Sequence, residues 1–274
     1  MTTASPALRT PAVRTATPSL RTQFGALTMR HVRAMLRQPA YLSISLIQAV
    51  LWLPLFGSVF RSVTDIPGFG SGSYISFLTP GVVVMSAFFS AAWAGMGFIN
   101  DMERGVMDRL LASPARRSAI VGSVLAYQAL LTTVQTVIIL LLGWALGTDY
   151  AGGVLGLLLL LLASIGIGML LAAFSSGLAM LVRKEESLVA ASNFLALPLT
   201  FMSSTLMARD LLPGWIQSIA LVNPLDWAVT VAREAITADP DWGSMLWRLG
   251  ALAGLTLLAG WLAARSFRSY QRSL

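Results

Sequence analysis

Few residues of this 274-residue sequence could carry out chemistry, and most of them lie in or beside long apolar segments. The sequence has no cysteine and one histidine, His31, which argues against disulfides, zinc-thiolate sites and histidine-clustered metal sites. Its one lysine, Lys184, does not follow a glycine-rich loop of the Gly-Lys-Ser/Thr kind, and no Gly-x-Ser-x-Gly motif is present. We therefore expect this chain to be no enzyme, to hydrolyse no ATP itself and to hold no metal or cofactor.

The remaining candidates are hydrogen-bonding side chains inside apolar segments. Gln128, Thr132 and Gln135 are spaced i, i+4 and i+7, so they share one face of a helix. Asn193 and Thr200 are also seven residues apart, in another apolar segment. Polar groups in lipid need partners, so these faces either line a substrate pathway or form hydrogen bonds between helices. Hydrogen bonds between helices are the favoured interpretation, and a substrate pathway is the alternative.

The composition indicates what kind of protein must position these groups. Apolar residues make up 56% of the chain and charged residues 11%, whereas a soluble domain has about 25% charged residues. Such a chain cannot cover itself with polar surface in water, and it is too apolar to be disordered. We expect an all-α integral membrane protein.

Six apolar stretches are long enough to cross the hydrocarbon core, which takes about 20 residues of helix. The predicted spans are residues 41–60, 74–100, 119–146, 154–182, 188–207 and 245–264. Residues 1–19 mix Thr, Ser, Pro and Arg without an apolar core, which predicts a disordered cytoplasmic tail. Residues 20–38 have apolar and basic faces at helical spacing, which predicts an amphipathic helix lying in the membrane interface.

The basic residues predict an orientation. With the N-terminus in the cytoplasm, 15 of the 19 basic residues fall on inner segments, while 7 of the 12 acidic residues fall on outer ones. The positive-inside rule then places both termini in the cytoplasm. Arginines at the membrane edges also account for the isoelectric point of about 10.7. Membrane lipid, rather than nucleic acid, is therefore the expected partner of these residues.

Two further segments are too polar to span. Residues 101–112 combine an apolar stripe with a charged flank, which predicts a short amphipathic helix at the inner surface, with a connector lying in lipid as the alternative. In residues 209–243, Asn223, Pro224 and Asp226 disfavour a seventh span. Two short re-entrant helices broken at Asn223–Pro224 and dipping into the outer leaflet fit this segment better, with a plain external loop as the alternative.

Two motifs are characteristic in this setting. The stretch ERGVMDRLLASP covers residues 103–114, and NPLDWAVTVAREA covers residues 223–235 before the last span. Together with the order of the spans, they resemble the membrane subunits of ATP-binding-cassette exporters of the type-2 permease family. The resemblance covers almost all of the chain after residue 20.

The resemblance implies roles for particular residues. In that family the first motif forms the coupling helix, which docks in a cleft of a separate ATPase. The implied coupling residues are Glu103, Arg104, Val106, Met107, Asp108, Leu110 and Leu111. The implied external motif is Asn223, Pro224 and Leu225. The implied partners are an ABC ATPase subunit and a second permease copy or a related permease.

The resemblance also implies a function. It is ATP-driven export of an amphiphilic compound, such as a drug, an antibiotic or a lipid-like molecule, across a bacterial cell membrane. Permeases similar to the daunorubicin exporter subunit are the narrower likeness, but relatives that export polysaccharide or lipid-linked glycan share the same motifs. Six apolar spans would also suit an ATP-independent channel or a membrane anchor subunit, and both fit the two motifs less well.

Overall fold

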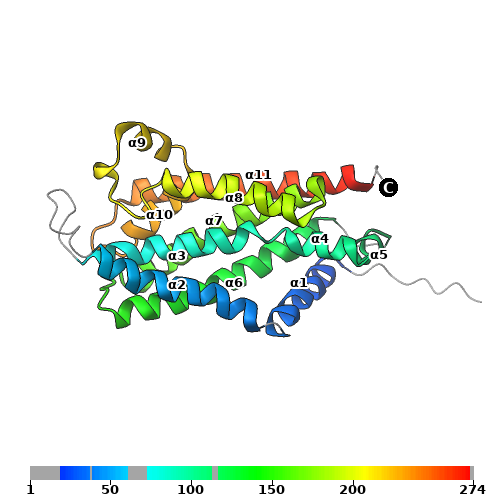
Figure 1. The fold of residues 1–274 in the computed structure, drawn as a ribbon, viewed down its shortest axis with the longest axis horizontal. Helices are drawn as coiled ribbons and strands as arrows, with labels where there is room; N and C mark the ends of the chain where they lie inside the picture. The colour runs from blue at the N-terminus through cyan, green and yellow to red at the C-terminus, as the bar shows by residue number, and fades with distance from the viewer. Residues whose placement is uncertain (1–18, 38, 61–72, 113–116, 272–274) are drawn as a thin grey trace, which may run out of the picture.

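The computed structural model describes residues 19–37, 39–60, 73–112 and 117–271, and all regular structure in these ranges is helical. Long helices run side by side along the molecule, with α1 and α5 at one end and α9 and α10 toward the other (Figure 1). The predicted all-α class is therefore confirmed. Of the predicted tail, residues 1–18 lie outside the described residues.

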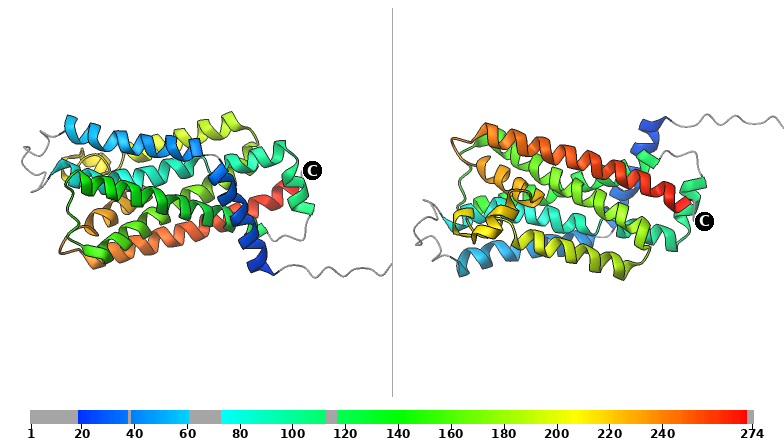
Figure 2. Two further views of the ribbon diagram at one scale, coloured as in Figure 1. Left: turned by 90° about the horizontal axis from the view of Figure 1, so that it is seen from below. Right: turned by 90° about the horizontal axis from the view of Figure 1, so that it is seen from above.

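The helices have the following bounds. In the first half they are α1 (Leu20–Arg37), α2 (Pro39–Val59), α3 (Tyr74–Ala92), α4 (Met96–Glu103), α5 (Val106–Ala112) and α6 (Arg117–Ala145). In the second half they are α7 (Gly153–Val182), α8 (Glu185–Phe201), the 3-10 turn η2 (Arg209–Leu211), α9 (Gly214–Ala220), α10 (Pro224–Glu234) and α11 (Trp242–Gln271). The amphipathic helix predicted over 20–38 corresponds to α1, which runs obliquely across the bundle and packs on α6 (Figure 2).

Among the described residues, 4 helical segments are long and apolar enough to cross a membrane. They are Tyr74–Glu103, Ser118–Ala145, Gly153–Val182 and Trp242–Ser266. They match the second, third, fourth and sixth predicted spans. The first and fifth predicted spans correspond to α2 and α8, which run alongside these helices (Figures 1 and 2). α8 has 17 residues and ends at Phe201, short of the predicted boundary at 207.

The second predicted span is interrupted where the sequence predicts one helix over 74–100. α3 ends at Ala92, Trp93 to Gly95 form a turn, and α4 begins at Met96. The Ser175 hydroxyl of α7 donates to the Ala92 carbonyl at 2.7 Å and accepts from the Gly95 N–H at 3.0 Å. Ser192 of α8 donates to the same carbonyl at 3.0 Å. Serines on two neighbouring helices therefore satisfy the backbone groups that the interruption frees.

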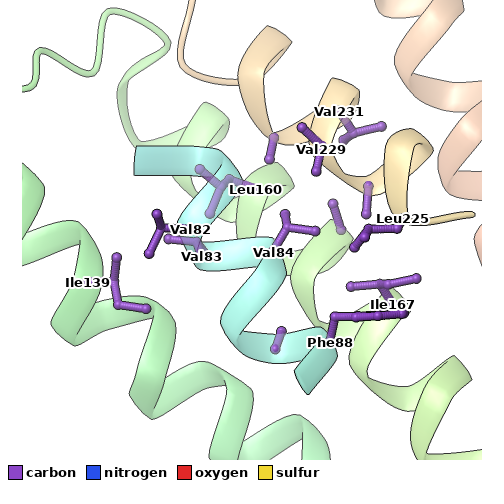
Figure 3. Packing of buried hydrophobic residues seen from close by; sticks show 14 of the residues in the cluster. Val82, Val83, Val84, Phe88, Ile139, Leu160, Ile167, Leu225, Val229 and Val231 are labelled. Atoms are coloured by element: carbon purple, nitrogen blue, oxygen red, sulfur yellow. The ribbon is translucent and has the colours of Figure 1, made fainter. Parts of the chain in front are cut away.

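α7 is the central helix of the bundle. It packs against α3, α4, α6, α8, α10 and α11. Its buried positions are rich in glycine, alanine and serine, which allow helices to approach closely. Valines of α3 meet Leu160 and Ile167 of α7 and apolar residues of α10 in the main hydrophobic core (Figure 3). The short helix α10 is thus held in the core by its buried residues.

Gly156 permits the closest of these approaches. A Cβ built at Gly156 would collide with the carbonyl oxygen of Ala235, the residue that ends α10. At Gly166, on the same helix, an added Cβ would meet Leu252 at an ordinary 3.8 Å. The end of α10 can therefore lie this close to α7 only because residue 156 has no side chain.

Gly156→Ala is expected to lower the free energy of unfolding by about 1–3 kcal/mol, because α7 and α10 must separate to admit the methyl group. Thermal unfolding of the purified protein in detergent, followed by circular dichroism, measures the effect. Gly166→Ala is the matched control and should leave the midpoint unchanged or raise it slightly. Equal midpoints for the two variants would show that α10 does not rest on Gly156.

Candidate functional site

The segment predicted as one short helix over 101–112 is divided in the structure. α4 ends at Glu103, Arg104 and Gly105 form a turn, and α5 begins at Val106. Gly105 has a φ of 63°, in the left-handed region that glycine adopts without strain. The ERGVMD sequence therefore turns a corner, and its charged residues lie on two helices.

α5 is anchored to the bundle mainly through Met107. This side chain is fully buried, and burying a methionine contributes about 1.5–3 kcal/mol. It belongs to a second hydrophobic cluster, which includes Ile120 and Val121 of α6, Met180 of α7 and Leu188 of α8. Met107 therefore ties α5 into a cluster to which α6, α7 and α8 contribute.

The remaining residues of this segment are more open. Glu103, Arg104 and Asp108 are exposed, and Val106 and Leu110 are half-buried. Leu111 belongs to α5, and its side chain lies outside the described side chains. Exposed charges of both signs therefore lie beside half-buried apolar groups. We call Glu103, Arg104, Val106, Asp108 and Leu110 the α4–α5 surface.

An ion pair joins this segment to α1. The guanidinium of Arg30 donates to the carboxylate of Asp101, in the last turn of α4. The Asp101 side chain is 13% exposed and that of Arg30 is 41% exposed, so the pair is only partly shielded from solvent. An exposed pair of this kind contributes up to about 1 kcal/mol. Its main effect is to fasten α1 to the end of α4.

The predicted polar face on 119–146 lies on α6 and is buried. Gln128 donates from Nε2 to Ser90 Oγ of α3 at 3.1 Å and to Thr132 Oγ1 at 3.3 Å. Ser90 Oγ in turn donates to Gln135 Oε1 at 3.2 Å. The structure therefore brings Gln128, Thr132 and Gln135 together around a serine of α3. These side chains form hydrogen bonds between α6 and α3 and also along α6 itself.

The other predicted pathway residues are on α8. Thr200 is buried and donates to the Ala196 carbonyl of its own helix at 2.8 Å. Asn193 is half-buried. α3 packs against both α6 and α8 and lies between them in Figure 1. The polar residues of the third and fifth predicted spans are thus on different sides of α3 and do not form one site.

Asn223 joins three parts of the chain at the α9 end. Its Oδ1 accepts from the Leu225 N–H at 3.0 Å, which caps α10, and Pro224 occupies the first turn, where no N–H is needed. Its Nδ2 donates to the carbonyls of Leu199 at 2.8 Å and Met202 at 3.0 Å. These are carbonyls at the end of α8, so one side chain both starts α10 and closes α8.

Two charged residues of α10, the buried Asp226 and the half-buried Arg233, hold the loop that follows α8. Asp226 is 1% exposed, and its Oδ1 accepts from the Ser204 N–H at 2.7 Å. Arg233 donates to the Thr205 carbonyl at 2.9 Å and lies 3.7 Å over the Phe77 ring. The other oxygen of Asp226 lies 4.0 Å from the Arg209 guanidinium, so Asp226 also has a charged partner. In the part of the chain described, no group of three or more His, Asp or Glu side chains is placed to hold a metal ion.

Comparison with known proteins assigns the fold to a family. The family model described as ABC-2 type transporter matches residues 22–237, which include the α4–α5 surface and α10. The chain belongs to the ABC-2 type transporter family. It is an ABC transporter permease, a multi-pass membrane protein whose family associates with an ABC ATPase subunit.

Relatives with transport functions cover most of the permease. The ycf38 transport permease of Cyanophora paradoxa is 32% identical over 72% of this chain and 68% of its own length. The ycf38 transport permease of Porphyra purpurea is 30% identical over 79% of this chain and 74% of its own. The daunorubicin resistance ABC transporter permease protein DrrB1 of Streptomyces coeruleorubidus is 29% identical over 82% of this chain and 77% of its own.

The sequence does not predict the structural roles of several residues of the permease that hydrogen-bond to the polar side chains or to the backbone at helix ends. Ser90, Ser175 and Ser192 are single serines in apolar segments. From the sequence, a serine with a structural role in such a segment looks the same as a serine that is tolerated because it is small. Asp226 and Arg233 are charged residues in a partly apolar segment, and this pattern is the feature of the sequence that could have indicated their structural role. Their partners include backbone groups of the loop after α8, which no side-chain pattern reveals.

Asn223→Ala is expected to lower the free energy of unfolding of the permease by about 2–3 kcal/mol, because it removes the cap of α10 and strands two carbonyls. Asn223→Asp should destabilise at least as much, since it keeps the cap but points a carboxylate at those carbonyls. Thermal unfolding in detergent measures both. Ser218→Ala, at an exposed hydroxyl of α9, is the control and should change little. A wild-type midpoint for Asn223→Asp would mean that capping alone accounts for Asn223.

Proposed function

We propose that this permease is the membrane subunit of an ATP-driven exporter that moves an amphiphilic compound out of the cytoplasm or inner leaflet. The observation that carries the proposal is the α4–α5 surface, where exposed charges sit on a helix anchored by the buried Met107. A permease needs such a lever if its energy comes from a separate ATPase. The coupling residues are then Glu103, Arg104, Val106, Met107, Asp108, Leu110 and Leu111.

Six spans with cytoplasmic termini complete the proposed topology. At about 1.5 Å per residue, the 21 residues of α2 reach about 31 Å, which matches the hydrocarbon core. α8 reaches about 25 Å. Asn223, Asp226 and Arg233 form hydrogen bonds with backbone groups of the loop after Phe201, so this loop is tolerated within a membrane. α9 and α10 are then the re-entrant helices, at the external side. The α4–α5 surface faces the cytoplasm, where basic residues accumulate.

The route for cargo lies between two permease copies or between this permease and a related one. Gln128, Thr132 and Gln135 are engaged with Ser90, so the α3–α6 contact is closed rather than a passage. α8 carries exposed apolar residues, with Phe194 82% and Phe201 68% exposed, beside the half-buried Asn193. An exposed apolar stripe with an amide group suits a surface that contacts both a second permease copy and an amphiphilic cargo molecule.

A drug-like amphiphile is the proposed cargo. Support comes from the daunorubicin resistance permease DrrB1, which aligns over 82% of this chain, and from the scarcity of charged groups in the apolar helices. The proposed location is a bacterial cell membrane. A polysaccharide or lipid-linked glycan is the second candidate, and an ATP-independent channel or a membrane anchor subunit is a more distant one.

ATP binding would close the ATPase pair and push the α4–α5 surface. Met107 passes this displacement to α6, α7 and α8, and the Arg30–Asp101 pair passes it to α1. The external end is held by Asn223, Asp226 and Arg233. The bundle therefore responds by changing which side is open, as in alternating access.

Glu103→Arg combined with Leu110→Ala is expected to uncouple transport from hydrolysis, because it reverses one charge of the docking surface and removes an apolar contact. The ABC ATPase is first looked for as the product of the neighbouring gene, and the complex of the two proteins is placed in inside-out vesicles. ATP-driven uptake of daunorubicin by these vesicles should fall about tenfold, which corresponds to about 1.4 kcal/mol of docking free energy. ATP hydrolysis should persist. Glu186→Arg, at an exposed acid in the first turn of α8, is the control and should transport normally.

Each competing function has its own outcome in the same vesicles. Unchanged uptake in the double variant would overturn the proposed coupling surface. Daunorubicin flux down a gradient without nucleotide would identify a channel, and ATP hydrolysis without flux of any amphiphile would favour an anchor. A neighbouring cluster for polysaccharide synthesis would replace the drug by a glycan as cargo.

A further inference from the structure

A cavity of about 320 Å³ lies where α1, the α3–α4 interruption and α6 meet. Binding sites for small molecules have volumes of about 300–1,000 Å³, so this one is at the small end of that range. Its walls include Met35 of α1, Met96 and Phe98 of α4, and Tyr127 and Leu131 of α6. Trp93 also lines it and is 41% exposed, so the cavity reaches the side of the bundle.

Hydrogen-bonding groups are also present in the lining of this cavity. Ser90 and Gln128 line it, and Gln128 is only 1% exposed. The amide nitrogen of Gln128 donates to Ser90 and Thr132. No hydrogen bond to its carbonyl oxygen is found within the described parts of the chain. That oxygen can therefore accept a hydrogen bond from a molecule in the cavity.

The cavity is uncharged. Among the described residues that line it there is no Asp, Glu, Lys or Arg, and His31 is the one lining imidazole. Burial lowers the pKa of His31 below its ordinary value, Arg30 lowers it further, and Asp101 acts in the opposite direction. The lowered pKa favours the neutral imidazole. Its ring centroid lies 5.7 Å from that of Tyr127. A charged ligand would lose its hydration here without gaining a counter-ion.

We propose that this cavity binds a small, uncharged aromatic amphiphile that donates a hydrogen bond to Gln128. Aromatic rings and methionines form adaptable walls for flat apolar molecules. The opening beside Trp93 and under α1 suits entry from the membrane at the α5 end. Binding itself does not depend on the proposed function, whereas the identification of the bound compound as cargo rests on it.

The position of the cavity connects binding to conformational change. Ser90 lies before the interruption at residues 93–95, and Met96 and Phe98 lie after it. α4, which follows the interruption, is also tied to α1 by the Arg30–Asp101 pair. A ligand in the cavity therefore contacts both helices that meet at the interruption, and movement of α4 would change the volume available to it.

The test uses N-phenyl-1-naphthylamine, an uncharged aromatic amine that fluoresces in apolar surroundings. The full chain is placed in phospholipid nanodiscs without ATPase or nucleotide, and energy transfer from tryptophan to the probe is titrated against empty nanodiscs. We expect a saturable component. Gly97→Leu should weaken it at least about tenfold, because Gly97 lines the cavity and a Cβ there meets nothing within 4 Å, so the side chain can fill the space.

Controls separate cavity filling from general effects. Gly254→Leu is matched, since Gly254 lies in α11 with nothing within 4 Å of an added Cβ and does not line the cavity. It should bind the probe as the unchanged chain does. Ala34→Leu, at an exposed lining position of α1, repeats the test from the opposite wall if Gly97→Leu fails to fold.

The sulfonated analogue 8-anilinonaphthalene-1-sulfonate has the same rings and a negative charge. Its binding should be insensitive to Gly97→Leu and to Ala34→Leu. Absence of a saturable component for the uncharged probe, or equal binding by Gly97→Leu and Gly254→Leu, would overturn the proposal. Saturable binding together with failed daunorubicin transport would leave the site standing and would reject the proposed export.

Discussion

Every backbone N–H and C=O group within a bilayer must find a partner in the protein, because the hydrocarbon core holds no water to satisfy it. The permease interrupts its helices in spite of this constraint, and side chains of neighbouring helices close the interruptions. Ser175 and Ser192 bind the carbonyl that ends α3, and Asn223 binds two carbonyls at the end of α8. Several of its buried polar residues therefore lie where the helices break.

The two ends of the bundle use their charged residues differently. At the α9 end, Asp226 and Arg233 are directed into the protein and hold the loop after α8 to α10. At the α5 end, Glu103, Arg104 and Asp108 are exposed next to the turn at Gly105. Charged residues therefore hold backbone in place at one end of the bundle and form an open surface at the other.

The sequence predicted what depends on local composition and missed what depends on distant partners. Long apolar stretches predicted the all-helical class and six spans, four of which match helices that are long and apolar enough to cross a membrane. Helical spacing placed Gln128, Thr132 and Gln135 on one face. The turn before α4 could not be predicted, because the serine that stabilises it, Ser175, is 80 residues from Gly95. The positive φ of Gly105 is a local feature, but the apolar stripe that continues across it predicted an unbroken helix.

The contacts around the interruption at residues 93–95 also constrain how the permease can move. Met107 fixes α5 to α6, α7 and α8, so α5 cannot shift freely without moving those helices. α4, by contrast, lies between two turns and is tied to α1 through Asp101 and Arg30. A displacement at the α5 end would therefore reach α4 and α1 as well as α6, α7 and α8. α1 and α4 form two walls of the cavity beside Trp93, so a molecule bound there would contact helices that such a displacement moves.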